Sequence, residues 1–98
     1  MNAEERLLID GELVAAASGR TYPNINPATE EVMGEVADAG PEDMERAIAS
    51  ARRAFDETDW STNHAFRLKC LEQLKQGLLA EMEEFKQQIA AETGAPLG

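Results

Sequence analysis

The side chains best suited to covalent or acid–base chemistry are the single cysteine, Cys70, and the single histidine, His64. A cysteine thiolate beside a base is a strong nucleophile. Cys70, however, falls on the apolar side of an expected helix with no basic residue four positions away, so we interpret it as a core residue. His64 lies near an expected helix start, where a surface or capping contact is favoured, because a metal site needs further ligands at defined spacing.

Two groups of carboxylates could in principle supply a general acid and a general base. One group lies in an expected loop and the other on an expected helix: Asp56, Glu57 and Asp59, and Glu81, Glu83 and Glu84. A working pair needs burial to separate its two pKa values, whereas both of these groups are expected to be solvated. We therefore predict no catalytic residue in this chain.

The glycines are too scattered to form Gly-x-Gly-x-x-Gly or a phosphate-binding loop before a lysine, so no cofactor-binding residue is predicted. Trp60, Phe55 and Phe66 could line a ligand pocket. Three aromatic residues around a loop between two amphipathic helices more often form the core that joins the helices, and we favour that interpretation.

Length and charge exclude several classes of protein. The 98 residues suffice for one small domain with a modest core. A formal net charge of -10 should repel nucleic acid and anionic membranes. The chain opens on polar and acidic residues and contains no transmembrane run, and its single cysteine cannot form an internal disulfide. We therefore expect a cytoplasmic protein with neither nucleic acid nor membrane as a partner.

Residues 1–37 have the pattern of β-hairpins. Asp10-Gly11 separates two short apolar runs and predicts a two-residue hairpin turn. A second extended run contains Pro23, which places it at a sheet edge. The turn beginning at Asn26-Pro27 should return the chain into a strand near residues 32–36, although the alternation of that strand is imperfect.

Residues 40–57 and 62–93 have the pattern of amphipathic helices. Pro41 suits a first helical position, and ion pairs four residues apart are expected between Glu42 and Arg46 and between Arg52 and Asp56. The second segment should be capped by Thr62 or Asn63 and end at Gly94. Its apolar periodicity fits either one long helix or two consecutive helices with a bend near Glu81.

Several short motifs occur together in a specific order. They are Leu8-Ile9-Asp10-Gly11-Glu12, Ile25-Asn26-Pro27-Ala28-Thr29, Glu31-Val32, Gly34-Glu35-Val36, Ala47-Ile48-x-x-Ala51-Arg52-x-Ala54-Phe55, Asp59-Trp60, Arg67 and Glu92-Thr93-Gly94-x-Pro96. In this order the chain resembles the N-terminal part of the NAD(P)-dependent aldehyde dehydrogenase superfamily along nearly its whole length. Two positions depart from the family pattern: Glu30 replaces a usual glycine, and Ala95 replaces a usual lysine.

The resemblance implies an α+β fragment, with hairpins over residues 1–37 and two helices that separate near Glu81, forming the N-terminal portion of a cofactor-binding domain. It implies a parent enzyme that oxidises an aldehyde to a carboxylic acid with NAD or NADP through a cysteine thiohemiacetal, as a homo-oligomer, either a dimer or a tetramer. The catalytic and remaining cofactor-binding regions lie beyond Gly98, and Cys70 matches no catalytic position. The fragment alone is expected to be inactive, to bind no cofactor and to self-associate through exposed apolar helix surface.

The resemblance also implies a monovalent cation site. Its ligands would be the backbone carbonyls of Asn24 and Ile25 and the side chain of Glu92. The alternative is that Glu92 is only a last-turn helix carboxylate, because oxygen-ligand sites need more donors than these. For the chain as a whole, one alternative function is a short non-catalytic interaction module that keeps the family's N-terminal fold, and another is a remnant without function.

Overall fold

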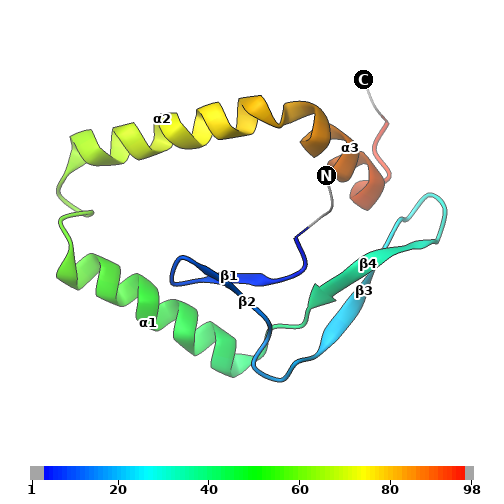
Figure 1. Ribbon diagram of the computed structural model, residues 1–98, viewed down its shortest axis with the longest axis horizontal. Coiled ribbons are helices and arrows are strands. Elements are labelled where there is room, and N and C mark those ends of the chain that lie inside the picture. The colour runs from blue at the N-terminus through cyan, green and yellow to red at the C-terminus, as the bar shows by residue number, and fades with distance from the viewer. Residues whose placement is uncertain (1–3, 97–98) are drawn as a thin grey trace.

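Two antiparallel hairpins followed by three helices make up the chain in a computed structural model, which describes residues 4–96 (Figure 1). The elements are β1 (Leu7–Ile9), β2 (Glu12–Val14), β3 (Thr21–Ile25), β4 (Val32–Ala37), α1 (Pro41–Glu57), α2 (His64–Ala80) and α3 (Met82–Thr93). The predicted α+β arrangement is therefore confirmed. The first three residues of the hairpin segment predicted over 1–37 lie outside the described residues.

The first hairpin joins β1 to β2 through a tight turn. Asp10 and Gly11 both have positive φ, 55° and 75° respectively. This is the conformation that a two-residue type I′ turn requires, and aspartate and glycine are among the residues that adopt it most readily. Leu7 pairs with Val14 in the resulting register.

The second hairpin joins β3 to β4 and is longer. Thr21 pairs with Ala37 at one end, and the register shifts between Asn24 and Ile25. This irregularity accounts for the imperfect alternation of apolar residues in the sequence, because a shift of register changes the face on which each side chain lies. Each sheet has two strands, so Pro23 lies on an edge strand, as its missing N–H predicts.

Helix α1 begins at Pro41, with Gly40 as its N-cap residue. The predicted pair between Arg52 and Asp56 is present at 2.7 Å. The predicted pairing of Glu42 with Arg46 is replaced by a contact of 2.5 Å between Arg46 and Asp43. Asp43 is one position closer along the helix, and its carboxylate is already held at the helix start by the backbone N–H of Gly40.

Helices α2 and α3 are consecutive and are separated at Glu81. The side chain of Asn63 accepts a hydrogen bond of 3.0 Å from the backbone N–H of Phe66, so Asn63 is the capping residue of the two candidates. Helix α3 ends where Gly94 adopts the left-handed conformation with a φ of 73°. The chain therefore has two helices over the segment that periodicity alone left undecided.

The prediction that Cys70 is a core residue is wrong, and the core is smaller even than the modest one that the length allows. Ala16 and Ala37, 5% and 7% exposed, are the only buried hydrophobic residues among those the structure describes. Cys70 is half-buried, and Leu71 and Leu74 on the same helix are 60% and 59% exposed. The physical reason is visible in Figure 1, where α2 runs along one side of an open, flat frame and packs extensively on no other element.

The predicted aromatic core between the helices is also wrong. Trp60 and Phe66 meet edge to face, with ring centroids 5.9 Å apart. Phe55 instead lies under the guanidinium of Arg52, which is 5.0 Å from the ring centroid. The three rings therefore form neither a common core nor a common pocket.

Within residues 4–96, no helix combines the length and apolar character needed to cross a membrane.

Candidate functional site

Asn24 and Glu92, two of the three residues of the predicted cation site, meet in the structure although 68 positions separate them. The amide nitrogen Nδ2 of Asn24, in β3, donates to Oε1 of Glu92, near the end of α3, at 3.2 Å. The same carboxylate oxygen accepts a second hydrogen bond of 2.7 Å from Nε2 of Gln88. The fold thus places the carboxylate of Glu92 against the strand whose carbonyls were predicted to bind the cation.

The end of α3 is seated against the turn that follows β3. A Cβ atom added at Gly94 would lie 3.3 Å from Cγ of Pro27, so the backbone at Gly94 approaches the Asn-Pro turn closely. The N–H of Gly94 donates to the carbonyl of Ala90 at 2.9 Å and closes the helix. A residue with a side chain would be strained at the φ of 73° and would also crowd Pro27.

Asn26 shapes the turn itself. Its Oδ1 accepts hydrogen bonds from the backbone N–H groups of Ala28, at 2.9 Å, and Thr29, at 3.3 Å. Oγ1 of Thr29 in turn accepts a hydrogen bond of 3.3 Å from the backbone N–H of Glu31, a local contact typical of threonine in turns. Glu30 has a φ of 64°, a left-handed conformation that glycine adopts more readily. Although this chain has glutamate where the family usually has glycine, the turn keeps the left-handed conformation that suits glycine.

The candidate ligands are all oxygen atoms, which suit hard monovalent or divalent cations. Two backbone carbonyls and one carboxylate are fewer than the roughly six ligands that such ions usually take. Residues outside 4–96 would have to complete the coordination. Within the described part of the chain, no group of three or more histidine, cysteine, aspartate or glutamate side chains could hold a metal ion.

An open groove of about 830 Å³ runs along β3, β4 and α3, and both Asn24 and Glu92 line it. Glu4, Glu5 and Arg6 line the same groove. Oε1 of Glu4 lies 2.7 Å from Nε of Arg6, and this hydrogen bond lowers the pKa of the Glu4 carboxyl below its ordinary value. The groove is therefore lined by several carboxylates, of which Glu4 is already paired with Arg6.

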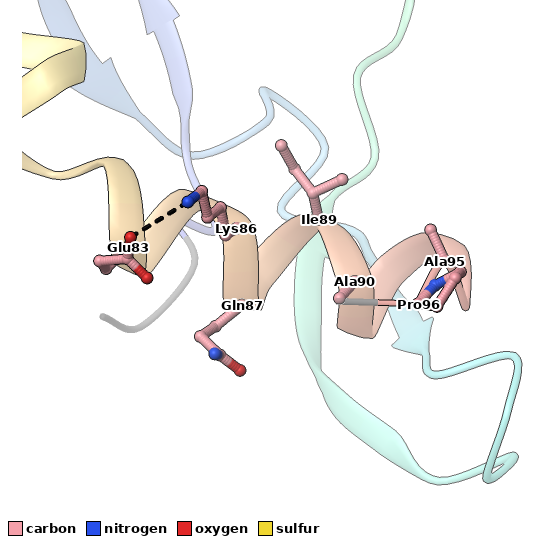
Figure 2. Close-up of a pocket in the computed structure, with 7 residues that line it drawn as sticks. All are labelled: Glu83, Lys86, Gln87, Ile89, Ala90, Ala95 and Pro96. Carbon is pink, nitrogen blue, oxygen red and sulfur yellow. Dashed lines mark hydrogen bonds and ion pairs between the residues drawn. The ribbon is translucent and has the colours of Figure 1, made fainter. Parts of the chain in front are cut away.

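A second groove, of about 420 Å³, lies between α3 and the segment that follows it (Figure 2). Its polar groups include Lys86 and Glu83, which pair at 3.1 Å, while Ala90 and Pro96 form part of an apolar wall. Figure 2 shows that the dashed contact between Lys86 and Glu83 joins two residues of the same helix. The two charged side chains that line this groove therefore pair with each other.

The two residues considered first for chemistry lie on α2. His64 is its first residue, and its Nδ1 contacts the guanidinium of Arg67, in line with a surface contact near a helix start. Cys70 is a free, half-buried thiol farther along the helix. In the described residues neither is part of an arrangement of nucleophile, base and orienting group. The sequence also contains neither Gly-x-Gly-x-x-Gly nor a glycine-rich phosphate-binding loop before a lysine.

Asp43 is the residue whose importance was not predicted. It is 3% exposed, and its carboxylate accepts hydrogen bonds of 3.0 Å from the backbone N–H groups of Gly40 and of Ala17. These backbone hydrogen bonds, led by that of Gly40, together with the Arg46 guanidinium, lower the pKa of the Asp43 carboxyl. An acid in the third position of a helix that starts with proline is the available sequence signal, since it resembles the second half of a capping box.

Comparison with known proteins identifies the fold. Residues 13–98 match the model of the aldehyde dehydrogenase family. The chain is 36% identical to the aminoacetaldehyde dehydrogenase of Pseudomonas aeruginosa over 98 residues, which is 99% of this chain and 20% of that protein. It is 34% identical to an NADP/NAD-dependent aldehyde dehydrogenase of Escherichia coli, covering 96% of this chain and 19% of that protein.

Solved structures agree with these relatives. An aldehyde dehydrogenase from Bacillus cereus superposes with a TM-score of 0.89 at 35% identity, covering 97% of this chain and 20% of that one. A betaine aldehyde dehydrogenase from Staphylococcus aureus, in complex with NAD+, gives a TM-score of 0.87 at 36% identity, covering 93% of this chain and 19% of that one. The chain therefore spans about one fifth of the length of these relatives.

Proposed function

Because this chain belongs to the aldehyde dehydrogenase family, we propose that it serves as the N-terminal part of an enzyme that oxidises an aldehyde to a carboxylic acid with NAD+ or NADP+. In such a reaction, the aldehyde, water and the oxidised dinucleotide give the carboxylic acid, the reduced dinucleotide and a proton. The observation that carries this proposal is the family match over residues 13–98. The bound NAD+ of the Staphylococcus aureus relative supports the choice of cofactor.

The role proposed for residues 4–96 is structural support within the cofactor-binding domain. The described residues contain neither a phosphate-binding loop nor an activated nucleophile, and Cys70 lies half-buried on α2. The cysteine that forms the thiohemiacetal and the residues that hold the dinucleotide would belong to the other four fifths of the fold. On this proposal, the fragment alone is inactive and binds no dinucleotide.

We propose that the same remainder of the fold covers the apolar side of α2. Three observations support this occupant. Leu71 and Leu74 are mostly exposed in this chain, the chain spans about one fifth of its relatives, and its fold agrees with theirs at TM-scores of 0.87 and 0.89. Exposed apolar surface of this extent is unusual for a small protein without a partner.

The decisive experiment is to sequence the gene beyond Gly98 and to assay the product. A reading frame that continues into a dinucleotide-binding domain, with a full-length protein that reduces NAD+ or NADP+ when an aldehyde is added, supports the enzyme. The formation of the reduced dinucleotide is followed by its absorbance with a panel of aldehydes. A stop codon at this point would exclude the activity for this polypeptide.

The cation site remains part of the proposal, with the carbonyls of Asn24 and Ile25 and the carboxylate of Glu92 as ligands. The hydrogen bond between Asn24 and Glu92 supports it, because it brings the two elements together. In the full-length protein, Glu92→Gln should reduce the thermal stabilisation given by K+ over a bulky cation such as tetramethylammonium. Glu84→Gln, which removes an exposed carboxylate from the same helix, is the matched control. Equal stabilisation of both variants and the parent protein would contradict the site.

A second candidate function is a short interaction module that binds a full-length relative through α2. The uncovered leucines of α2 favour it. It predicts that the 98-residue chain forms a complex with a full-length aldehyde dehydrogenase, whereas the enzyme proposal predicts self-association of the isolated chain. Light scattering of the chain, alone and mixed with the full-length enzyme, separates these outcomes.

We also propose that the parent enzyme is a homo-oligomer and lies in the cytoplasm. Sedimentation tests the oligomeric state, and cell fractionation tests the location.

A further inference from the structure

Hairpin β1–β2 contacts α1 through the residue at its tip. Oδ1 of Asp10 accepts a hydrogen bond of 2.9 Å from Oγ of Ser50, and its Oδ2 lies 3.2 Å from the guanidinium of Arg53. Ser50 and Arg53 are one turn apart on α1, so both face the same point of the hairpin. The two oxygens of one carboxylate thus join the tip of the hairpin to the middle of the helix.

The other end of the hairpin is held by a different carboxylate. The backbone N–H of Ala17, just after β2, donates to Oδ1 of Asp43 in the first turn of α1 at 3.0 Å. Asp43 is buried, whereas Asp10 and Arg53 are 67% and 51% exposed at their side chains. The hairpin therefore has a buried anchor at its base and a solvent-exposed contact at its tip.

Apolar packing between these two points is incomplete. An open groove of about 430 Å³ separates part of β1 from α1, and Leu7, Ile9, Met44 and Ala47 line it. Leu7 and Ile9 are half-buried and Met44 is 62% exposed, so apolar surface is only partly removed from water where the hairpin meets the helix. Because packing is only partial here, the polar contact at the tip should affect how tightly the hairpin is closed.

We propose that hairpin β1–β2 is a strap that opens from α1 as a unit, and that Asp10, Ser50 and Arg53 form the latch that closes it. An exposed ion pair contributes little stability and is weakened by salt, so the latch is poised to open. A hairpin with only three residues in each strand is marginally stable by itself. Opening should therefore expose its backbone amides to exchange while Asp43 still holds its base. This inference does not depend on the enzymatic proposal.

The test is hydrogen–deuterium exchange of the full protein, measured by mass spectrometry on peptides that cover the hairpin and α1. Arg53→Gln should accelerate exchange in the hairpin by about threefold to fivefold and leave α1 nearly unchanged. The matched control is Arg52→Gln, which makes the same change of charge one residue away. Arg52 pairs with Asp56 within α1 and does not form part of the latch, so this control should leave the hairpin unaffected.

The variant Asp10→Asn tests the latch while leaving the conformation of the hairpin turn intact. Asparagine also adopts the positive φ that the turn requires and can still accept from Ser50, but it removes the ion pair with Arg53. It should accelerate exchange of the hairpin about as much as Arg53→Gln does. The inference is overturned if Arg52→Gln and Arg53→Gln have the same effect, or if the hairpin and α1 exchange together. If a variant fails to fold, the same measurement on the unmodified protein tests the latch. Raising NaCl from about 0.05 to 0.5 M should accelerate hydrogen–deuterium exchange in the hairpin but not in α1. If exchange in the hairpin is not accelerated, the latch is overturned.

Discussion

Helices α1 and α2 have the same length of 17 residues, but they are positioned by different means. Helix α1 is joined to the first hairpin by the carboxylates of Asp43 and Asp10, and its first turn contains the one buried polar side chain of the described residues. Helix α2 has no buried residue. The comparison shows that hydrogen bonds to another element hold α1, whereas within residues 4–96 α2 has no extensive contact with another element.

The largest effect is expected from removing the anchor of α1. Asp43→Ala leaves the N–H groups of Gly40 and Ala17 without their shared acceptor, so the midpoint of thermal unfolding should fall by about 5–10 °C. Circular dichroism measures this change. Glu42→Ala, which removes an exposed acid from the same turn, is the control and should lower the midpoint much less. Equal effects of the two variants would mean that Asp43 acts only through the helix dipole.

Acidification should produce the same loss gradually. The backbone N–H of Gly40, then the Arg46 guanidinium, lower the pKa of Asp43 in the folded chain. A lowered folded pKa means that the stabilising contribution is fully present above the unfolded pKa of about 4 and is lost as the pH falls through the folded pKa. Urea unfolding between pH 6 and pH 3 should therefore show a steeper loss for the parent chain than for Asp43→Asn. Parallel curves would contradict this assignment.

The contrast between the two helices also marks what the sequence could predict. Local signals were sufficient at Asp10-Gly11, at Pro41 and at Gly94, because turn and cap conformations depend on the residues themselves. The approach of Asn24 to Glu92 came from the family resemblance, since no local pattern relates residues 68 positions apart. Burial of Asp43 was missed because it depends on a distant connector, the segment at Ala17. An apolar stripe predicts a helix, but it does not say whether the same chain covers that stripe, as Cys70 shows.

A smaller effect is expected at Gly77, within α2. A Cβ atom at this position would meet nothing within 4 Å. Glycine inside a helix is less favourable than alanine, so Gly77→Ala should raise the free energy of unfolding of the chain by about 0.5–1 kcal/mol. The reverse change in α1, Ala51→Gly at an exposed position, should lower it by a similar amount. Denaturation curves measure both. If Gly77→Ala were destabilising, another element would have to pack on α2, and the contrast between the helices would fail.

The smallest effect on stability is expected for Leu74→Gln, although leucine is a residue whose loss from a core usually costs several kcal/mol. Leu74 is 59% exposed, so the free energy of unfolding of the 98-residue chain should change by no more than about 0.5 kcal/mol. Self-association of the chain should decrease at the same time, because apolar surface is removed from the uncovered side of α2. Light scattering over a concentration series measures association, and Lys75→Gln, at the next position of the helix, is the control. A loss of 2 kcal/mol or more, in the range of about 2–5 kcal/mol typical of core leucines, would show that α2 is covered within this chain and that the two helices do not differ.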